Sequence, residues 1–352
     1  MLPLLLISLL PTTMSQIIQP LSPPSLIHPS GVYIRATPLS PSSILAAYAA
    51  PLDTHQALLT SLSTDNGTTW SPLGEVWRAA AATHDIDNAS PLQLPSGRIL
   101  FAFRNHDRAP GGAGYSWYRI TVCFSDDGGR RWGFLGHVVE HRAQGLNGVW
   151  EPFLRLGRRG EVQVYYSSET GSRGQENLMV FSEDGGGRWS APIVVSRREG
   201  ARDGMVGVAE DGRGGLICVF ETTEDGVFSV NRAVSPDDGY TWGERARVYT
   251  AAGGKNAGAP QVYKVGGTLV TSFMTNEGVG TPQLDGGQMK VVTSVNGGQT
   301  WSSGGAGSAV AATVAADVGA HWPGLYAIDQ SHFLALYSMD GIGAVSQLYR
   351  AG

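Results

Sequence analysis

The segment Ser182–Trp189 reads SEDGGGRW and is one of five copies of a single template, Ser-x-Asp-x-Gly-x-x-Trp. The other copies are Ser63–Trp70 (STDNGTTW), Ser125–Trp132 (SDDGGRRW), Ser235–Trp242 (SPDDGYTW) and Ser294–Trp301 (SVNGGQTW), where Asn296 replaces the aspartate. The carboxylate or amide can accept backbone N–H groups of its own turn, glycine allows positive φ, and tryptophan covers the turn with an apolar face. The template therefore predicts five β-hairpins of one kind.

The spacing of these copies predicts the architecture. Their tryptophans lie 62, 57, 53 and 59 residues apart. A period of about 58 residues fits one four-stranded antiparallel blade with its loops, so 352 residues hold six blades. We expect an all-β, six-bladed β-propeller. Its sixth blade comes from strands near Tyr326, His332–Tyr337 and Val345–Tyr349, closed by an N-terminal strand around Ile17–Ile27.

The template resembles the Asp-boxes of sialidases and related propellers. In those proteins the boxes lie on hairpins at the outer edge, and this implies that here too they stabilise turns rather than carry chemistry. Function has to be sought where the blades differ.

Composition agrees with a large β protein and excludes several classes of function. There are 48 glycines, and only 16% of residues are charged, which favours tight turns over long solvated helices. An apolar fraction of 42% with nine tryptophans can fill a large core. The net charge is −5 and the 25 Lys and Arg are scattered, so we expect neither a nucleic-acid surface nor a membrane-binding basic patch.

The N-terminus predicts export. Leu2–Leu10 is an apolar run too short to span a bilayer, and we expect residues 1–15 to be a signal peptide and 16–352 a single catalytic propeller domain. The alternative is an ordinary apolar N-terminus. The sequons at Asn66 and Asn88 agree with a secreted, extracellular protein, although either can remain unused.

The sequence indicates no cofactor and no metal. Its two cysteines, Cys123 and Cys218, stand within apolar strand-like runs, where buried free thiols are expected rather than a disulfide framework. No metal-ligand spacing of Cys or His, phosphate loop or dinucleotide fingerprint occurs.

Candidate functional residues follow from the inner strand pairs that precede the boxes. Each pair is joined by a turn at Gly97, Gly160 or Gly214. Counting nine residues back or seven forward from equivalent turns gives polar side chains expected at one mouth of the axial channel: Asn88, Glu151, Arg104, Ser167, Glu221, His321 and Tyr337.

Three glutamates near this mouth suggest the chemistry. Glu151 lies in the apolar and aromatic segment GVWEPF, Glu221 ends an apolar strand, and Glu169 follows Tyr165–Ser168. An apolar setting raises the pKa of a carboxyl group and suits a proton donor or a nucleophile. Paired carboxylates in a sugar-sized pocket favour glycoside hydrolysis, although a glutamate at a strand end is often only solvated.

Several of these segments resemble the fungal exo-α-1,5-L-arabinanases of glycoside hydrolase family 93. The resemblance rests on Leu92–Gly97, Ala102–Asp107, Val149–Phe153 and Phe220–Thr222, with Asp87-Asn88 before them, and extends from about Gly31 to the C-terminus. It implies a sialidase-like propeller that releases arabinobiose from the non-reducing end of linear α-1,5-L-arabinan with retention. It also implies a polysaccharide as the partner and a monomer without cofactor.

The resemblance further implies roles for individual residues. Glu151 and Glu221 would be the catalytic pair, with Glu151 favoured as acid/base and Glu221 as nucleophile, and Glu169 would be a third pocket carboxylate. Retention would place the two catalytic carboxyls about 5–5.5 Å apart. Hydrogen bonds to sugar hydroxyls would come from Arg35, Asp87, Arg104, Asn105 and His106, and stacking faces from Trp150, Tyr166 and Tyr337.

Two other functions share this fold. A sialidase needs three arginines, and although Arg35 has the expected place and Arg104 a possible one, Met274 stands where a third would lie. A non-catalytic carbohydrate-binding propeller would have glutamates too far apart to cooperate, or a mouth filled by side chains. A glycan on Asn88 would obstruct the predicted site, so we expect Asn88 to be unmodified or turned away.

Overall fold

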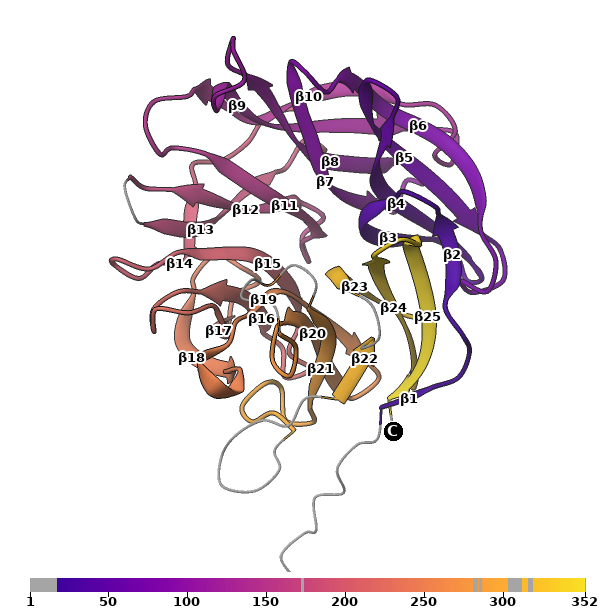
Figure 1. Cartoon of the computed structure of the whole chain (residues 1–352), viewed down its shortest axis with the longest axis vertical. Helices are drawn as coiled ribbons and strands as arrows, with labels where there is room; N and C mark the ends of the chain where they lie inside the picture. Colours follow the sequence, from indigo (N-terminus) through magenta and orange to yellow (C-terminus); the bar gives the residue numbers. More distant parts are fainter. Residues whose placement is uncertain are drawn as a thin grey trace, which may run out of the picture.

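The structure is a computed structural model that describes residues 18–171, 174–280, 284, 287–302, 312–315 and 319–351. The predicted signal peptide, residues 1–15, lies outside the described residues. Six antiparallel sheets follow one another around a central axis, and the expected six-bladed β-propeller is confirmed (Figure 1). Blades are numbered here in chain order.

In each of the first five blades the strands pair in chain order, from the axis outward. Blade 1 contains β3 (Val32–Ser40), β4 (Ser43–Leu52), β5 (His55–Ser63) and β6 (Ser71–Ala80). Blade 2 contains β7 (His84–Gln93), β8 (Ile99–Arg108), β9 (Tyr115–Ser125) and β10 (Gly133–Arg142). Blade 3 contains β11 (Val149–Leu156), β12 (Val162–Glu169), β13 (Gln175–Ser182) and β14 (Ile193–Ser196). Blade 4 contains β15 (Asp203–Glu210), β16 (Leu216–Thr222), β17 (Ser229–Ser235) and β18 (Gly243–Tyr249). Blade 5 contains β19 (Ala257–Val265), β20 (Thr268–Thr275), β21 (Gln288–Ser294) and β22 (Ala312–Ala315), after the short 3-10 helix η1 (Ala252–Gly254).

The sixth blade joins the two ends of the described chain. It contains β23 (Ala320–Ala327), β24 (His332–Met339) and β25 (Gly343–Ala351), and β25 also pairs with the N-terminal strands β1 (Ile18–Pro20) and β2 (Ser25–His28). Ile18 pairs with Ala351, and Leu26 pairs with Val345. The predicted closure by an N-terminal strand is therefore confirmed, and the outer edge of the last blade is covered.

All five boxes form the expected turns with one pattern of hydrogen bonds. In the first box the Ser63 hydroxyl donates to Asp65 and accepts from the Gly67 amide, while the Thr69 amide donates to Asp65. Asn296 accepts from Thr300 in the same way in the fifth box. Because these bonds favour the charged carboxylate, they lower the pKa of Asp65 against the opposing effect of burial.

The boxes also pack against neighbouring blades. A Cβ atom at the fifth position of any box would lie less than 3.0 Å from a side chain of the preceding blade, from Leu334 at the first box to Ile217 at the last. Trp70 of the first box donates to the Ser346 hydroxyl on β25. The boxes are thus contacts between blades as well as turns.

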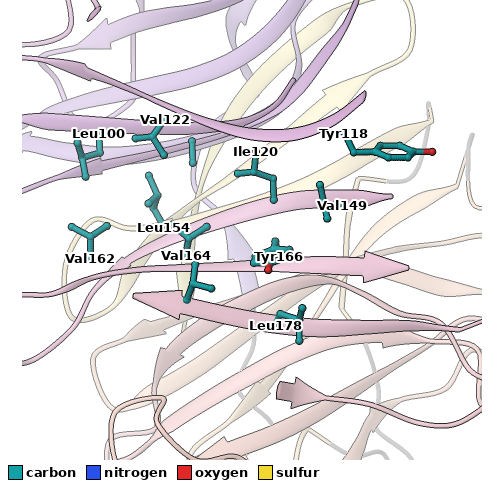
Figure 2. Packing of buried hydrophobic residues seen from close by; sticks show 12 residues of the cluster. Leu100, Tyr118, Ile120, Val122, Val149, Leu154, Val162, Val164, Tyr166 and Leu178 are labelled. Carbon is teal, nitrogen blue, oxygen red and sulfur yellow. The ribbon is translucent and has the colours of Figure 1, made fainter. Parts of the chain in front are cut away.

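The hydrophobic core lies between adjacent blades. Figure 2 shows one such layer, in which Leu100, Ile120 and Val122 of blade 2 face Leu154 and Val164 of blade 3. Cys123 and Cys218 belong to equivalent layers, and both are buried free thiols, as predicted. The sheets are therefore apolar on both faces, and polar groups gather at the ends of the strands.

The inner strand of each blade carries a β-bulge at the same place. At each bulge one non-glycine residue takes positive φ: Tyr33 (55°), Asn88 (60°), Glu151 (48°), Met205 (49°), Ala259 (51°) and Trp322 (47°). The register shifts at these six points, and the inner strands of adjacent blades contact each other around the axis. We call these six residues the bulge ring. A bulge re-aims a side chain out of the regular alternation of the strand.

Candidate active site

The bulge ring separates into polar and apolar residues. Asn88 and Glu151 are its polar members. Tyr33, Met205 and Ala259 pack with Met274, and Leu284 and Trp322 lie against them. We call these six residues the apolar wall. The ring thus combines one carboxylate with a large apolar surface, an arrangement typical of sites that bind organic ligands.

Glu151 is held at the polar part of the ring. Burial raises the pKa of its carboxyl group, while the charge of Arg104, the Ser167 hydroxyl, the charge of Arg202 and the Met205 amide act in the opposite direction. Its Oε2 atom is buried without a hydrogen-bond partner among the described residues. A carboxylate oxygen that has lost water and gained no donor is available to a substrate.

Glu221 comes from the next blade, where it ends the apolar run of β16. Its Oε2 accepts the Ala259 amide at 2.7 Å. Two glycines leave room for it, because a Cβ atom at Gly258 would lie 2.6 Å from Oε2 and one at Gly204 would lie 3.4 Å from Oε1. Glu221 is therefore seated against backbone from two blades.

The charge of Glu151 influences the titration of Glu221. Burial raises the pKa of Glu221 to about 7, and the negative charge of Glu151 adds to this, against the Ala259 amide and the charge of Arg202. A carboxylic acid that holds its proton near neutral pH beside a charged carboxylate is the arrangement that separates a proton donor from a nucleophile.

Glu169 lies beside this pair and is bound to Arg202. Its Oε1 accepts from the Arg202 guanidinium at 3.3 Å, and its Oε2 accepts the Gly148 amide at 3.0 Å. Arg202 also donates to the Gln175 side chain at 2.6 Å. Glu169 thus positions the cation whose charge opposes the rise in pKa of both Glu151 and Glu221.

Arg104 and two aspartates form the polar corner on blade 2. Arg104 donates to Asp85 at 3.0 Å and lies 3.7 Å from Asp87, and Tyr115 also donates to Asp85. Burial raises the pKa of Asp87. Burial also acts to raise the pKa of Asp85, but the charge of Arg104, the Tyr115 hydroxyl and the charge of Arg108 together outweigh it and lower that pKa. The corner offers both hydrogen-bond donors and acceptors to a polyol.

Trp150 connects this corner to Glu151. The Arg104 guanidinium lies over its ring at 5.4 Å. Behind it is His106, which is fully buried and packed edge-on against Trp150, Tyr115 and Tyr118. Burial lowers the pKa of His106 to about 3. His106 is thus a neutral support for the Trp150 ring, and its contact with sugar hydroxyls stays a prediction.

Two predicted stacking residues also belong to the core. Tyr166 is 4% exposed and lies in the layer between blades 2 and 3, as Figure 2 shows. Tyr337 is 1% exposed, packs between blades 5 and 6, and donates to Gln347. The prediction of a stacking face is therefore wrong for both, because alternate strand residues point into the layers between blades.

Three further predicted residues are buried around the ring. Arg35 donates to the carbonyls of Ile34 and Trp322, and its guanidinium lies 4.0 Å from the centre of the Tyr33 ring. It therefore ties two members of the bulge ring together. Asn105 donates to Thr121. Asn88 is 5% exposed, which agrees with the expectation that it carries no glycan.

Sequence reasoning missed several residues of the site. Arg202, Asp85, Tyr115 and the apolar wall were not predicted. A signal for part of the wall was present, because counting nine residues back from Gly214 gives Met205, the bulge residue of blade 4. The same count in the last blade gave His321, one residue short of Trp322.

The described residues contain no group of three or more His, Cys, Asp or Glu that could hold a metal ion. In the same ranges of the chain, no helix has the length and apolar character needed to cross a membrane.

Comparison with known proteins supports the fold. No protein-family model and no curated protein matches the chain in sequence. Among solved structures, an α-L-arabinofuranosidase from Fusarium graminearum bound to an iminosugar inhibitor matches with a TM-score of 0.67 at 20% identity, over 96% of this chain and 98% of that one. An α-L-arabinanase from Penicillium chrysogenum bound to arabinobiose matches with a TM-score of 0.65 at 18% identity, over 97% and 99%.

A sialidase from Trypanosoma rangeli bound to sialic acid matches with a TM-score of 0.62 at 12% identity, over 93% of this chain and 55% of that one. At these identities the likeness concerns the fold.

Proposed function

We propose that the protein is a secreted retaining glycoside hydrolase that cleaves linear α-1,5-L-arabinan from its non-reducing end and releases arabinobiose. The observation that carries this proposal is the pair Glu151 and Glu221 at the mouth. Glu151 has a buried oxygen without a partner among the described residues, and its charge helps burial to raise the pKa of Glu221 to about 7. The solved structures of the same fold that are bound to arabinobiose or to an iminosugar support the choice of sugar. The resemblance in sequence described above supports the bond that is cleaved.

The environments of the two glutamates suggest their roles. Two arginines, Arg104 and Arg202, favour the charged form of Glu151, whereas Glu221 has Arg202 alone and is opposed by the charge of Glu151. We therefore assign Glu151, whose carboxylate two arginines favour, as the nucleophile, and Glu221, whose pKa is raised to about 7, as the general acid. This reverses the roles favoured from sequence, where the aromatic segment around Glu151 suggested an acid.

The reaction then proceeds in two displacements. A Glu151 oxygen attacks the anomeric carbon while Glu221 donates its proton to the departing O5 of the next sugar, which breaks the glycosidic bond and forms a glycosyl ester. Glu221, now a carboxylate, takes a proton from water as that water attacks the anomeric carbon. The ester bond breaks, the sugar leaves with its original configuration, and both glutamates return to their starting states.

The surrounding groups fit a neutral furanose chain. The donors and acceptors of Arg104, Asp85 and Asp87 are placed for ring hydroxyls, and the partly exposed rings of Trp150 and Trp322 offer surface to the C–H faces of the sugars. A sialic acid would need cations for its carboxylate. At two of the places where a sialidase has arginines, Arg35 is occupied with backbone carbonyls and Met274 belongs to the apolar wall.

Product analysis tests the activity. The protein is incubated with linear arabinan and with sialyllactose, and we expect arabinobiose from the first and no sialic acid from the second. Glu151→Gln and Glu221→Gln should each lose activity, while Glu210→Gln, a change at an exposed glutamate on β15, should not. Free sialic acid would make the protein a sialidase, and no product from either substrate would favour a binding propeller.

Azide separates the two roles. In Glu221→Ala, azide should attack the glycosyl ester on Glu151 and give an arabinosyl azide of retained configuration. In Glu151→Ala it should replace the nucleophile and give the inverted azide. The opposite pairing of variant and configuration would exchange the roles assigned above.

A further inference from the structure

A cavity lies on the same end of the propeller as the glutamates. It has a volume of about 370 Å³ and lies where blade 6 meets blade 1, bounded by segments 29–32 and 338–343 together with His321 and Trp322. Segment 338–343 follows the second strand of its blade, just as Glu169 and Glu221 stand at the ends of theirs. We call this cavity the side pocket.

Trp322 joins the side pocket to the candidate active site. It is a member of the bulge ring, lies against the apolar wall and lines the side pocket. The wall also contains Ala259, whose amide holds Glu221. The partly exposed Trp322 is therefore the residue that connects the candidate active site to the side pocket.

The lining of the side pocket contains an unused polar group. Ser338 is 97% buried, since its exposure is only 3%, and its hydroxyl has no hydrogen-bond partner among the described residues. An unpaired buried hydroxyl costs free energy unless a ligand or water satisfies it. His321 Nε2 and Asp340 Oδ1 are 2.9 Å apart at the rim, and the Asp340 carboxylate is 62% exposed.

The charges of the lining define the class of ligand. Of the described residues that line the side pocket, none is Lys or Arg, and Asp340 supplies a negative charge. An acidic sugar would meet this carboxylate without a Lys or Arg to compensate. An aromatic face at Trp322, a hydroxyl at Ser338 and a carboxylate acceptor at Asp340 instead suit a neutral polyol with an apolar face.

We propose that the side pocket is a subsite for one neutral sugar ring of the substrate chain, removed from the bond that Glu151 and Glu221 cleave. The assignment to the substrate chain rests on the proposed function. The pocket volume is near the lower end for small-molecule sites, which fits a single ring better than a branch. The subsite makes catalysis depend on chain length.

Two variants test the subsite without touching the catalytic pair. Ile342 is 43% exposed and lines the side pocket, so Ile342→Trp should fill it, while Asp340→Ala removes an acceptor. Val295→Trp is the matched control, because Val295 is 65% exposed on the box hairpin of blade 5, at the opposite end of the strands.

The measurement is kcat/KM for arabino-oligosaccharides of three to six sugars. In the wild type we expect a rise of about tenfold at the one chain length that first reaches the side pocket. Both variants should abolish that rise and leave the shortest cleaved substrate unchanged, whereas Val295→Trp should keep it. A rise that persists in Ile342→Trp, or an equal loss at every length, would overturn the subsite.

Binding separates this proposal from the proposed function. Glu221→Gln is titrated by calorimetry with arabinotetraose, other neutral tetrasaccharides and sialyllactose, with and without Ile342→Trp. If the wild type cleaves no arabinan but a neutral tetrasaccharide binds Glu221→Gln about tenfold more weakly when Ile342→Trp is added, the subsite stands and its substrate changes. If no neutral oligosaccharide is sensitive to Ile342→Trp, or if sialyllactose binds in preference, the subsite is refuted.

Discussion

The boxes and the bulge ring are both repeated features, but the boxes repeat side-chain hydrogen bonds and the bulge ring repeats a backbone conformation. At the five boxes the hydrogen bonds recur with the same residue types, including the exchange of aspartate for asparagine at Asn296. At the bulges the backbone recurs and the side chains range from alanine to tryptophan. One end of the blades thus repeats its chemistry, whereas the other repeats a backbone shape on which different side chains make a site.

The two ends of the blades also differ in backbone strain. Each bulge holds a non-glycine residue in the left-handed region, which disfavours the fold by about 1 kcal/mol or more. In the boxes most residues with positive φ are glycines, which avoid that cost, and the exceptions, Asn66 and Asp238, are of types that tolerate the left-handed region. Backbone strain is therefore concentrated at the mouth, and the box end provides contacts between the blades.

The largest effect expected is from Glu221→Gln. Removal of the general acid should lower kcat on arabinan by about a thousandfold or more. Because the folded pKa of Glu221 is raised to about 7, its proton stabilises the fold at low pH, and that stability is lost as pH rises from the unfolded value of 4.5 through 7. The glutamine variant should therefore have a higher Tm at pH 8. A lower Tm of Glu221→Gln at pH 8 would show that the charged Glu221 carboxylate does not destabilise the fold.

Gly258→Ala tests the mouth without changing its charges. The new Cβ atom would lie 2.6 Å from Glu221 Oε2, and Gly258 does not have positive φ, so the backbone can accept alanine. Displacement of the carboxyl should lower kcat/KM by about a hundredfold. Thermal melting should show a smaller fall in Tm for Gly258→Ala than for Gly239→Ala, the box variant described next.

Gly239→Ala makes the same substitution in a box. Gly239 has φ of 102° and a Cβ atom there would lie 2.7 Å from the Tyr165 hydroxyl, so we expect a loss of about 2–4 kcal/mol of stability. Denaturant titration measures this loss. Activity per folded molecule should be unchanged, and a loss of kcat at full folding would show that boxes affect the mouth.

The pH profile of kcat/KM should have an alkaline limb near pH 7. Above that pH Glu221 loses the proton that it must donate, so the rate should fall about tenfold per pH unit. The control is a substrate with a nitrophenol leaving group, which needs little protonation and should lose less. An unchanged rate to pH 9 on arabinan would remove Glu221 from the role of acid.

The smallest effect is expected for Asp237→Asn in a box. Asn296 already forms the same turn, so Tm at pH 7 should change by about 1 °C or less. The pKa of Asp237 is lowered by hydrogen bonds from Thr241 and Ser235 that outweigh burial, so its contribution is present above the unfolded pKa and is lost as pH falls through the lower folded value. The variant should lack that acid-dependent loss in melts between pH 5 and pH 2.

Most of the fold could be predicted because it depends on local sequence patterns. The spacing of the boxes predicted the number of blades. The N-terminal strand was expected to close the ring because the last blade would otherwise have an unpaired edge. The two glutamates could be found because each stands at a countable distance from a turn glycine. Both belong to strands whose register is fixed by apolar residues.

The rest of the site depends on geometry that the sequence pattern does not contain. The turn between the first two strands of the last blade contains no glycine, so counting from Gln330 placed His321 rather than Trp322 at the ring. Tyr166 and Tyr337 look equivalent to exposed aromatics in sequence, yet both lie between blades. Arg202 precedes β15, and only the packing of blade 3 on blade 4 brings it to Glu169.

The pairing of β25 with β1 and β2 also has a consequence for the order of events during synthesis. The first two strands to leave the ribosome have no other partner in the described sheets than the last one. They must therefore wait unpaired until nearly the whole chain has emerged. Completion of the ring is the most non-local step of folding, and blade 6 is where an incompletely made chain exposes its edges.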